Sequence, residues 1–78
     1  MDTLKELQQI IAAILGVPAA SVHSESGASD FSEWDSVHHL LLMLEIEEKF
    51  GFKLALEEIP ELDTVGKIMK AVQKRVAT

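Results

Sequence analysis

The sequence predicts a small all-α fold: a four-helix bundle of three main helices and one short helix, with a long loop between helices one and two. Three segments carry apolar residues at helical spacing, which is the main signal of an amphipathic helix. One segment alternates like a strand, but no second strand is available to pair with it. Because 78 residues are the size of one domain, we expect a single domain over residues 1–78.

The first helix is expected from about Leu4 to Leu15. Thr3 and Glu6 stand at the spacing of a capping box, and Gly16 closes the segment. Its apolar stripe consists of Leu4, Leu7, Ile10, Ile11 and Ile14. The polar residues between them indicate only a solvated face.

Residues 16–35 show neither helical nor strand periodicity, and they predict a loop of about twenty residues. Loops of this length are uncommon in compact domains and are usually functional or disordered. Val22, Phe31 and Trp34 favour order, because large apolar groups are seldom placed in a loose linker. We expect these side chains to pin the loop over the helices and so to fix the position of Ser36.

The second helix follows this loop, and both of its ends are signalled. Ser36 is a favoured N-cap, Asp35 adds negative charge at the positive end of the helix dipole, and Gly51 is a C-terminal stop. At about 100° per residue, two apolar faces result. One face, suited to the core, consists of Leu42, Met43, Ile46 and Phe50. The other consists of Val37, Leu41 and Leu44, beside Glu45 and Glu48. One face is enough to bury a helix, so we interpret the second as a partner-binding face beside a modifiable serine.

The rest of the chain predicts one short turn and one helix. Pro60 limits the segment from Leu56 to Leu62 to a single helical turn, because proline removes a backbone donor. Asp63 or Thr64 is expected to cap the final helix. Its apolar stripe consists of Val65, Ile68, Met69, Val72 and Val76.

Charge and composition exclude several classes of function. Residues 1–63 hold all 13 acidic residues and three lysines, which gives −10, whereas residues 64–78 hold three lysines and one arginine, which gives +4. An acidic surface repels phosphate backbones, so we expect no nucleic-acid partner. The longest apolar run, Leu40 to Leu44, is too short to span a membrane, and cysteine is absent. We expect a cytoplasmic monomer with no membrane span.

Catalytic and metal sites are both disfavoured. His39 could reach Ser36 on a helix, but no nucleophile elbow, oxyanion hole or cleft accompanies the pair. His38 and His39 point about 100° apart, so they would chelate one metal ion poorly. We expect no catalytic residue and no metal, with His39 near the core and His38 toward solvent or a partner.

The spacing of residues across nearly the whole chain resembles the acyl carrier protein family. The matching positions are Asp35, Ser36, Leu40, Leu42, Ile46, Glu47, Glu48, Phe50, Leu62, Thr64, Val65 and Ile68. The resemblance implies a four-helix domain that carries acyl chains as thioesters on a 4′-phosphopantetheine arm. It implies that Ser36 is the attachment site, that a phosphopantetheinyl transferase modifies it, and that Asp35 assists that enzyme.

Two further site predictions come with this resemblance. The second helix would be the recognition helix for acyl-loading and acyl-processing enzymes, through Val37, His38, Leu41, Leu44, Glu45 and Glu48. The carried chain could tuck between the helices, in a pocket lined by Leu42, Met43, Ile46, Phe50, Leu54, Ile59, Leu62 and Ile68. For a short or polar cargo, these eight residues could equally be plain core.

The sequence departs from the family pattern around the serine. Glu33 replaces the common glycine, Val37 replaces leucine, and His38 and Leu41 occupy positions that are often acidic. The docking face is therefore less acidic and more apolar, and we expect partners with basic or apolar surfaces in a specialised fatty-acid, polyketide or related pathway. Such a carrier would present acyl or aminoacyl groups. The alternative is an unmodified helical adaptor that binds a protein through Val37, Leu41 and Leu44.

Overall fold

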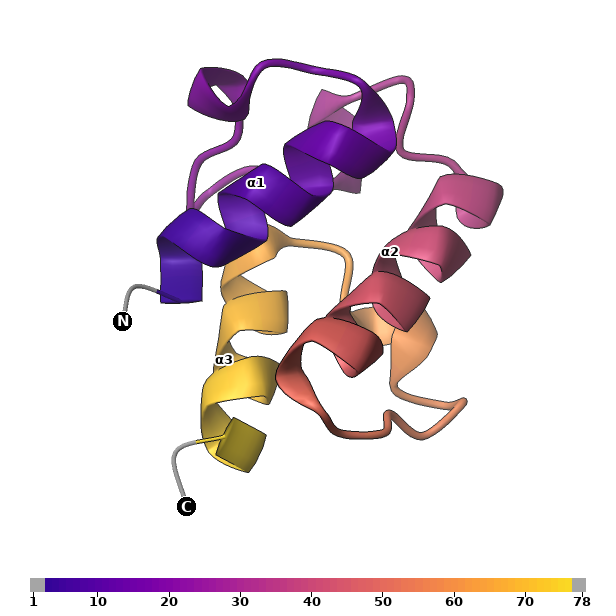
Figure 1. The fold of residues 1–78 in the computed structure, drawn as a ribbon. Helices are drawn as coiled ribbons and strands as arrows, with labels where there is room; N and C mark the ends of the chain where they lie inside the picture. Colours follow the sequence, from indigo (N-terminus) through magenta and orange to yellow (C-terminus); the bar gives the residue numbers. More distant parts are fainter. Residues whose placement is uncertain (1–2, 77–78) are drawn as a thin grey trace.

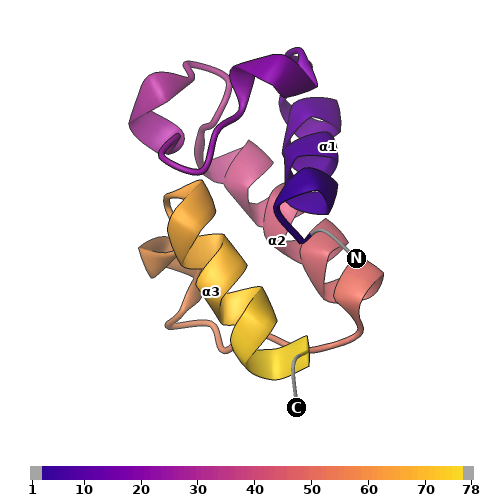
Figure 2. The same ribbon diagram turned by 90° about the vertical axis from the view of Figure 1, so that its left-hand side faces the viewer.

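The computed structural model describes residues 3–76 and shows an all-α bundle. Its main helices are α1 (Thr3–Leu15), α2 (Ser36–Phe50) and α3 (Val65–Val76). Three 3-10 turns connect them: η1 (Ala19–Ser21), η2 (Ala28–Asp30) and η3 (Ile59–Glu61). Helix α1 packs against both α2 and α3 (Figures 1 and 2). The predicted all-α fold is confirmed, and the short fourth helix is the single turn η3 around Pro60.

The core lies between the three helices, and the predicted stripes supply most of it. Leu4, Ile10 and Ile14 of the first stripe are only half-buried at its edge. The buried apolar residues of the core are Leu7, Ile11, Ala12, Leu15, Val22, Trp34, Leu42, Met43, Ile46, Leu62, Val65, Ile68 and Val72. Phe50 and Met69 are half-buried against this cluster. The side chain of Val76, expected in the last stripe, lies outside the described residues. Among the described residues, no helix has both the length and the apolar character needed to cross a membrane.

The start of α2 differs from the prediction, because Asp35 and not Ser36 is the N-cap. Asp35 has extended backbone angles, and its Oδ1 accepts a hydrogen bond from the backbone N–H of His38 at 2.9 Å. Aspartate caps as well as serine does, and here its carboxylate also pairs with the His38 ring. Ser36 therefore becomes the first residue of the helix. The predicted stop at Gly51 is confirmed by its left-handed backbone, with φ of 74°.

The long loop is ordered and is attached to the beginning of α3. Val22 and Trp34 are buried and Phe31 is half-buried, as predicted. Backbone hydrogen bonds of 2.9 Å join Ala28 N to the Asp63 carbonyl and Val65 N to the Ser26 carbonyl. Gly27 lies between these bonds and forms an isolated antiparallel bridge with Thr64. The loop is thus held to the start of α3.

The connection between α2 and α3 is held by polar contacts and forms no strand. Arg75, near the end of α3, donates to both carboxylate oxygens of Glu58 at 2.7 and 2.6 Å and lies over the Phe52 ring. A hydrogen bond from the backbone N–H of Ala55, followed by the Arg75 contact, lowers the pKa of Glu58. Thr64 caps α3, because its Oγ1 accepts from the backbone N–H of Lys67 at 3.1 Å.

Candidate functional site

Ser36 lies on an exposed corner of the molecule, at the first residue of α2. It borders a hollow of about 210 Å³ whose other lining residues are Ala28, Trp34, Asp35, His39, Pro60 and Asp63. The first N–H groups of a helix have no intrahelical partners, and the dipole there favours negative charge. A group attached to the Ser36 hydroxyl would therefore start at the mouth of a hollow and at the positive end of a helix.

Asp35 places a negative charge beside Ser36. Its Oδ1 accepts from the backbone N–H of His38 and lies 2.8 Å from Nδ1 of the same residue. The backbone hydrogen bond, and then the side-chain contact, lower the pKa of this exposed carboxyl group. Asp35 is consequently ionised at neutral pH, with His38 turned toward it at the surface.

His39 faces inward, as predicted, and both of its ring nitrogens are engaged. The indole Nε1–H of Trp34 donates to His39 Nδ1 at 2.8 Å, and His39 Nε2 lies 2.6 Å from the carbonyl oxygen of Ile59. The two rings stack with centroids 6.0 Å apart. A general base for Ser36 would need a free ring nitrogen within reach of its hydroxyl. His39 offers none, so this geometry argues against a serine nucleophile.

The described residues contain no cluster suited to a metal ion. Within residues 3–76, no three His, Cys, Asp or Glu side chains converge closely enough to hold one. His38 points to Asp35 and His39 points to Trp34, so the two adjacent histidines serve different contacts.

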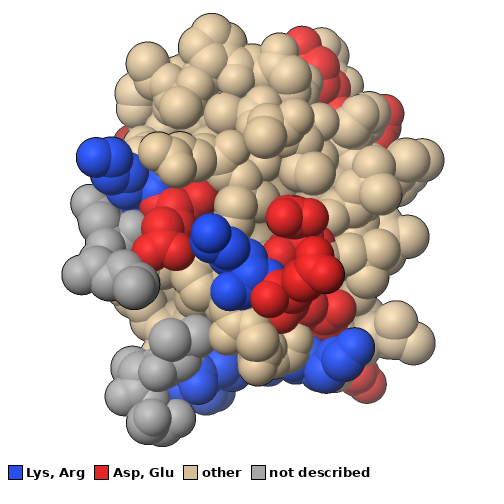
Figure 3. Space-filling view, in the orientation of Figure 1, with Lys and Arg blue, Asp and Glu red and all other residues tan. Residues whose placement is uncertain are grey.

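The predicted partner-binding face of α2 is open to solvent. Val37 is 65% exposed, Leu41 47% and Leu44 53%, and Glu45 and Glu48 are also exposed beside them. Leu40, which is 50% exposed, extends this face, although sequence reasoning assigned it no role there. Its position gave the signal, because residue 40 is three positions after Val37 and four before Leu44. Acidic side chains gather over the C-terminal half of α2, with basic side chains next to them (Figure 3).

The residues predicted to line an acyl pocket lie together in the core. Leu42, Met43, Ile46, Leu62 and Ile68 are buried, whereas Phe50, Leu54 and Ile59 are half-buried. The hollow beside Ser36 is lined by other residues. A carried chain that entered this region would therefore have to displace packed side chains, and the pocket stays a prediction.

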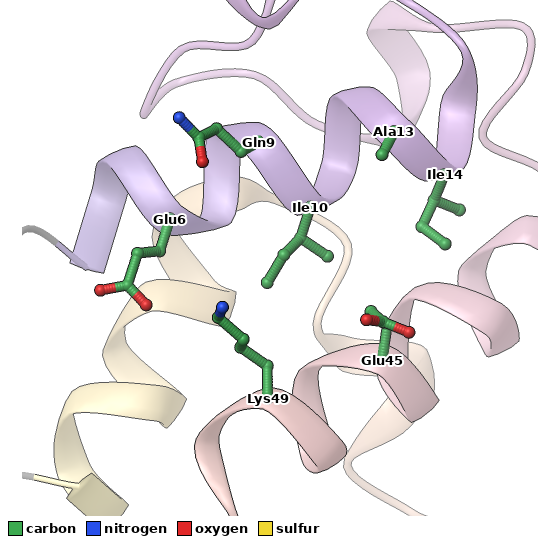
Figure 4. Close-up of a pocket in the computed structure, with 7 residues that line it drawn as sticks. All are labelled: Glu6, Gln9, Ile10, Ala13, Ile14, Glu45 and Lys49. Carbon is green, nitrogen blue, oxygen red and sulfur yellow. The ribbon is translucent and has the colours of Figure 1, made fainter.

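A second, larger hollow lies away from Ser36, between α1 and α2 (Figure 4). Its volume is about 410 Å³, and it is lined by Glu6, Gln9, Ile10, Ala13, Ile14, Glu45 and Lys49. Half-buried isoleucines form its apolar part, and charged side chains form its rim. Its lining contains no serine, so this hollow offers no hydroxyl group that could take the place of Ser36.

Comparison with known proteins gives a consistent result. The sequence family described as "Phosphopantetheine attachment site" matches residues 5–72. The acyl carrier protein of Thermobifida fusca is 32% identical over 73 residues, covering 94% of this chain and 92% of the relative. The acyl carrier protein of Chlamydia trachomatis serovar D is 31% identical over 75 residues, covering 96% and 97%.

A much longer protein and a solved structure are also similar. The non-reducing polyketide synthase SAT8 of Stachybotrys chartarum is 40% identical over 77 residues, which cover 96% of this chain but 3% of the synthase. The solution structure of holo acyl carrier protein from Geobacter metallireducens superimposes with a TM-score of 0.85. It is 31% identical, and the match covers 99% of this chain and 88% of that protein.

Proposed function

This chain belongs to the acyl carrier protein family, whose members are carriers and not enzymes, and we propose from that premise that Ser36 bears its arm. The family's cofactor is a covalently attached 4′-phosphopantetheine, whose terminal thiol holds the cargo as a thioester. The assignment of Ser36 as the attachment site rests on one observation. Ser36 is an exposed serine at the first residue of a helix, beside a hollow and next to an ionised aspartate.

The residues around Ser36 fit a phosphodiester. In the loading reaction, the Ser36 oxygen forms a bond to the phosphorus of coenzyme A that carries pantetheine. The pyrophosphate bond breaks, adenosine 3′,5′-bisphosphate leaves, and the hydroxyl proton passes to a base on the transferase. The negative charge that remains on Ser36 lies at the positive end of α2, which offsets its repulsion from Asp35.

We propose that partner enzymes dock on the exposed face of α2. Its apolar centre consists of Val37, Leu40, Leu41 and Leu44, and Glu45 and Glu48 form an acidic rim. Protein interfaces commonly combine an apolar centre with a charged rim. The partners that fit this face are acyl-loading and acyl-processing enzymes with an apolar patch flanked by basic residues. The similarity to a segment of a polyketide synthase supports a specialised acyl pathway.

The experiment that tests the attachment site is intact mass spectrometry. The chain is incubated with coenzyme A and a broad-specificity phosphopantetheinyl transferase, and the gain of one phosphopantetheine is expected. Ser36→Ala should show no gain, whereas Ser32→Ala, which removes an exposed loop serine, should load like the wild type. Loading of Ser36→Ala would refute the assignment. No loading of the wild type, by a transferase that modifies another carrier, would refute the proposal for this chain.

A further inference from the structure

Trp34, His39 and Ile59 form a hydrogen-bonded chain next to Ser36. The indole of Trp34 is 5% exposed, and its one polar group donates to His39 Nδ1 at 2.8 Å. An indole N–H only donates, so Nδ1 must present its lone pair. The carbonyl oxygen of Ile59 only accepts, so the nitrogen 2.6 Å away, Nε2, must carry the proton. The geometry therefore assigns His39 to the neutral Nε2–H tautomer.

This chain of bonds joins three segments that are separate in sequence. Trp34 ends the long loop, His39 lies in the first turns of α2, and Ile59 begins η3. The rings of Trp34 and His39 also stack on each other. Removing the imidazole would leave a buried indole N–H without an acceptor, which is costly in a desolvated position. His39 therefore links the end of the loop, α2 and η3 through one side chain.

In the sequence, Ser36 lies between Trp34 and His39, the two aromatic residues that the hydrogen bond joins. Trp34 is two residues before it and His39 three residues after it, and both side chains border the hollow at Ser36. Within residues 3–76, the Ser36 hydroxyl has no hydrogen-bond partner of its own. Its placement thus depends on the residues that flank it.

We propose that His39 is a positioning residue for the attachment site, acting through Trp34 and Ile59 to keep the corner at Ser36 in the form that the transferase binds. The proposal rests on the assignment of Ser36 as the modified residue. When only a fraction of molecules has a binding-competent corner, the apparent affinity falls by that fraction. Loss of the imidazole should therefore raise KM for the carrier chain and leave kcat nearly unchanged, because the reacting groups are intact.

The test compares loading kinetics of matched variants with coenzyme A and the same transferase. His39→Leu, which removes both bonds, should raise KM about fivefold to tenfold, the effect of losing a bond to a buried donor, with kcat within about twofold. His39→Gln should recover part of this loss, because a side-chain amide keeps one acceptor and one donor. His23→Leu makes the same change at an exposed loop histidine and should load like the wild type.

Two further measurements do not require His39→Leu to fold. Nitrogen-15 NMR should show the Nε2–H tautomer of His39, and Trp34→Phe, which keeps an aromatic ring but removes the donor, should raise KM in the same direction. Wild-type KM in His39→Leu or Trp34→Phe, or an Nδ1–H tautomer, would overturn the inference. Absence of loading on Ser36 in the wild type would instead refute the attachment site. The tautomer of His39 would still show whether it bonds to Trp34 and Ile59 as described.

Discussion

Substitution of Gly27 by alanine should destabilise the protein by about 2 to 3 kcal/mol. The backbone of Gly27 is extended, so alanine could adopt its angles, and the obstacle is space. An added Cβ would lie 2.9 Å from the Asp63 carbonyl oxygen and 3.1 Å from Cγ2 of Thr64. That carbonyl is fixed, because it accepts from Ala28 N. To relieve these two close contacts, the loop must move away from the start of α3, and this movement lengthens the two backbone hydrogen bonds beside Gly27.

The size of this loss in the free energy of unfolding follows from these contacts. Overpacking costs about 1 to 3 kcal/mol, and each weakened hydrogen bond costs up to about 1 kcal/mol. The lower flexibility of alanine in the unfolded chain offsets about 0.4 to 1 kcal/mol of this. A domain of this size has a free energy of unfolding of roughly 4 to 12 kcal/mol, so the loss is a large share of it.

Urea unfolding followed by Trp34 fluorescence and by circular dichroism measures this effect. With an m-value near 1 kcal/mol/M, the midpoint should fall by about 2 to 3 M. Gly66→Ala is the matched control, because the nearest atom to its added Cβ is the Ser24 carbonyl oxygen at 3.4 Å, an ordinary contact. It should leave stability unchanged or raise it by up to about 1 kcal/mol, through the higher helix propensity of alanine. A Gly27→Ala midpoint equal to that of the wild type would refute the argument from close approach.

Three other changes have defined outcomes. Leu41→Glu should change the free energy of unfolding by less than about 0.5 kcal/mol but weaken binding to a partner enzyme, measured by calorimetry; a large loss of stability would mean that Leu41 belongs to the core. Asp35→Ala should lower the unfolding midpoint more than Ser36→Ala, because Asp35 is the helix cap, and equal midpoints would contradict that assignment. The lowered pKa of Glu58 means that its contribution to stability is present above the ordinary carboxyl pKa of about 4.3 and is lost as pH falls through the folded-state pKa. Glu58→Gln should therefore show a smaller decrease in thermal midpoint between about pH 5 and pH 3, and an unchanged pH profile would exclude this role.

The helices could be predicted because each buries a stripe that repeats at the helical period. Leu7 and Ile11 of α1 and Ile68 and Val72 of α3 are buried as that pattern requires. The cap of α2 could not be predicted in the same way. Asp35 and Ser36 are equally good capping types, and the choice depends on which oxygen reaches the backbone N–H of His38.

The site was only partly predictable from the sequence. Exposure of Ser36 and of Val37 follows from their positions on the helix. Leu40 was harder to place, because it begins a run of five apolar residues of which only some can face the core. The contact of Trp34 with His39 and Ile59 could not be predicted, because it joins segments that become neighbours only in the folded chain.

The bridge between Gly27 and Thr64 also constrains the order in which the molecule can assemble. All of α2, including Ser36, lies within the chain segment that this bridge closes. Closing a long segment requires loop entropy to be lost before the contacts compensate for it, so local helix formation comes first and closure comes late. We therefore expect the corner that presents Ser36 to form late in folding. A transferase that recognises this corner would load only chains that have completed those steps, which makes the modification a marker of a finished fold.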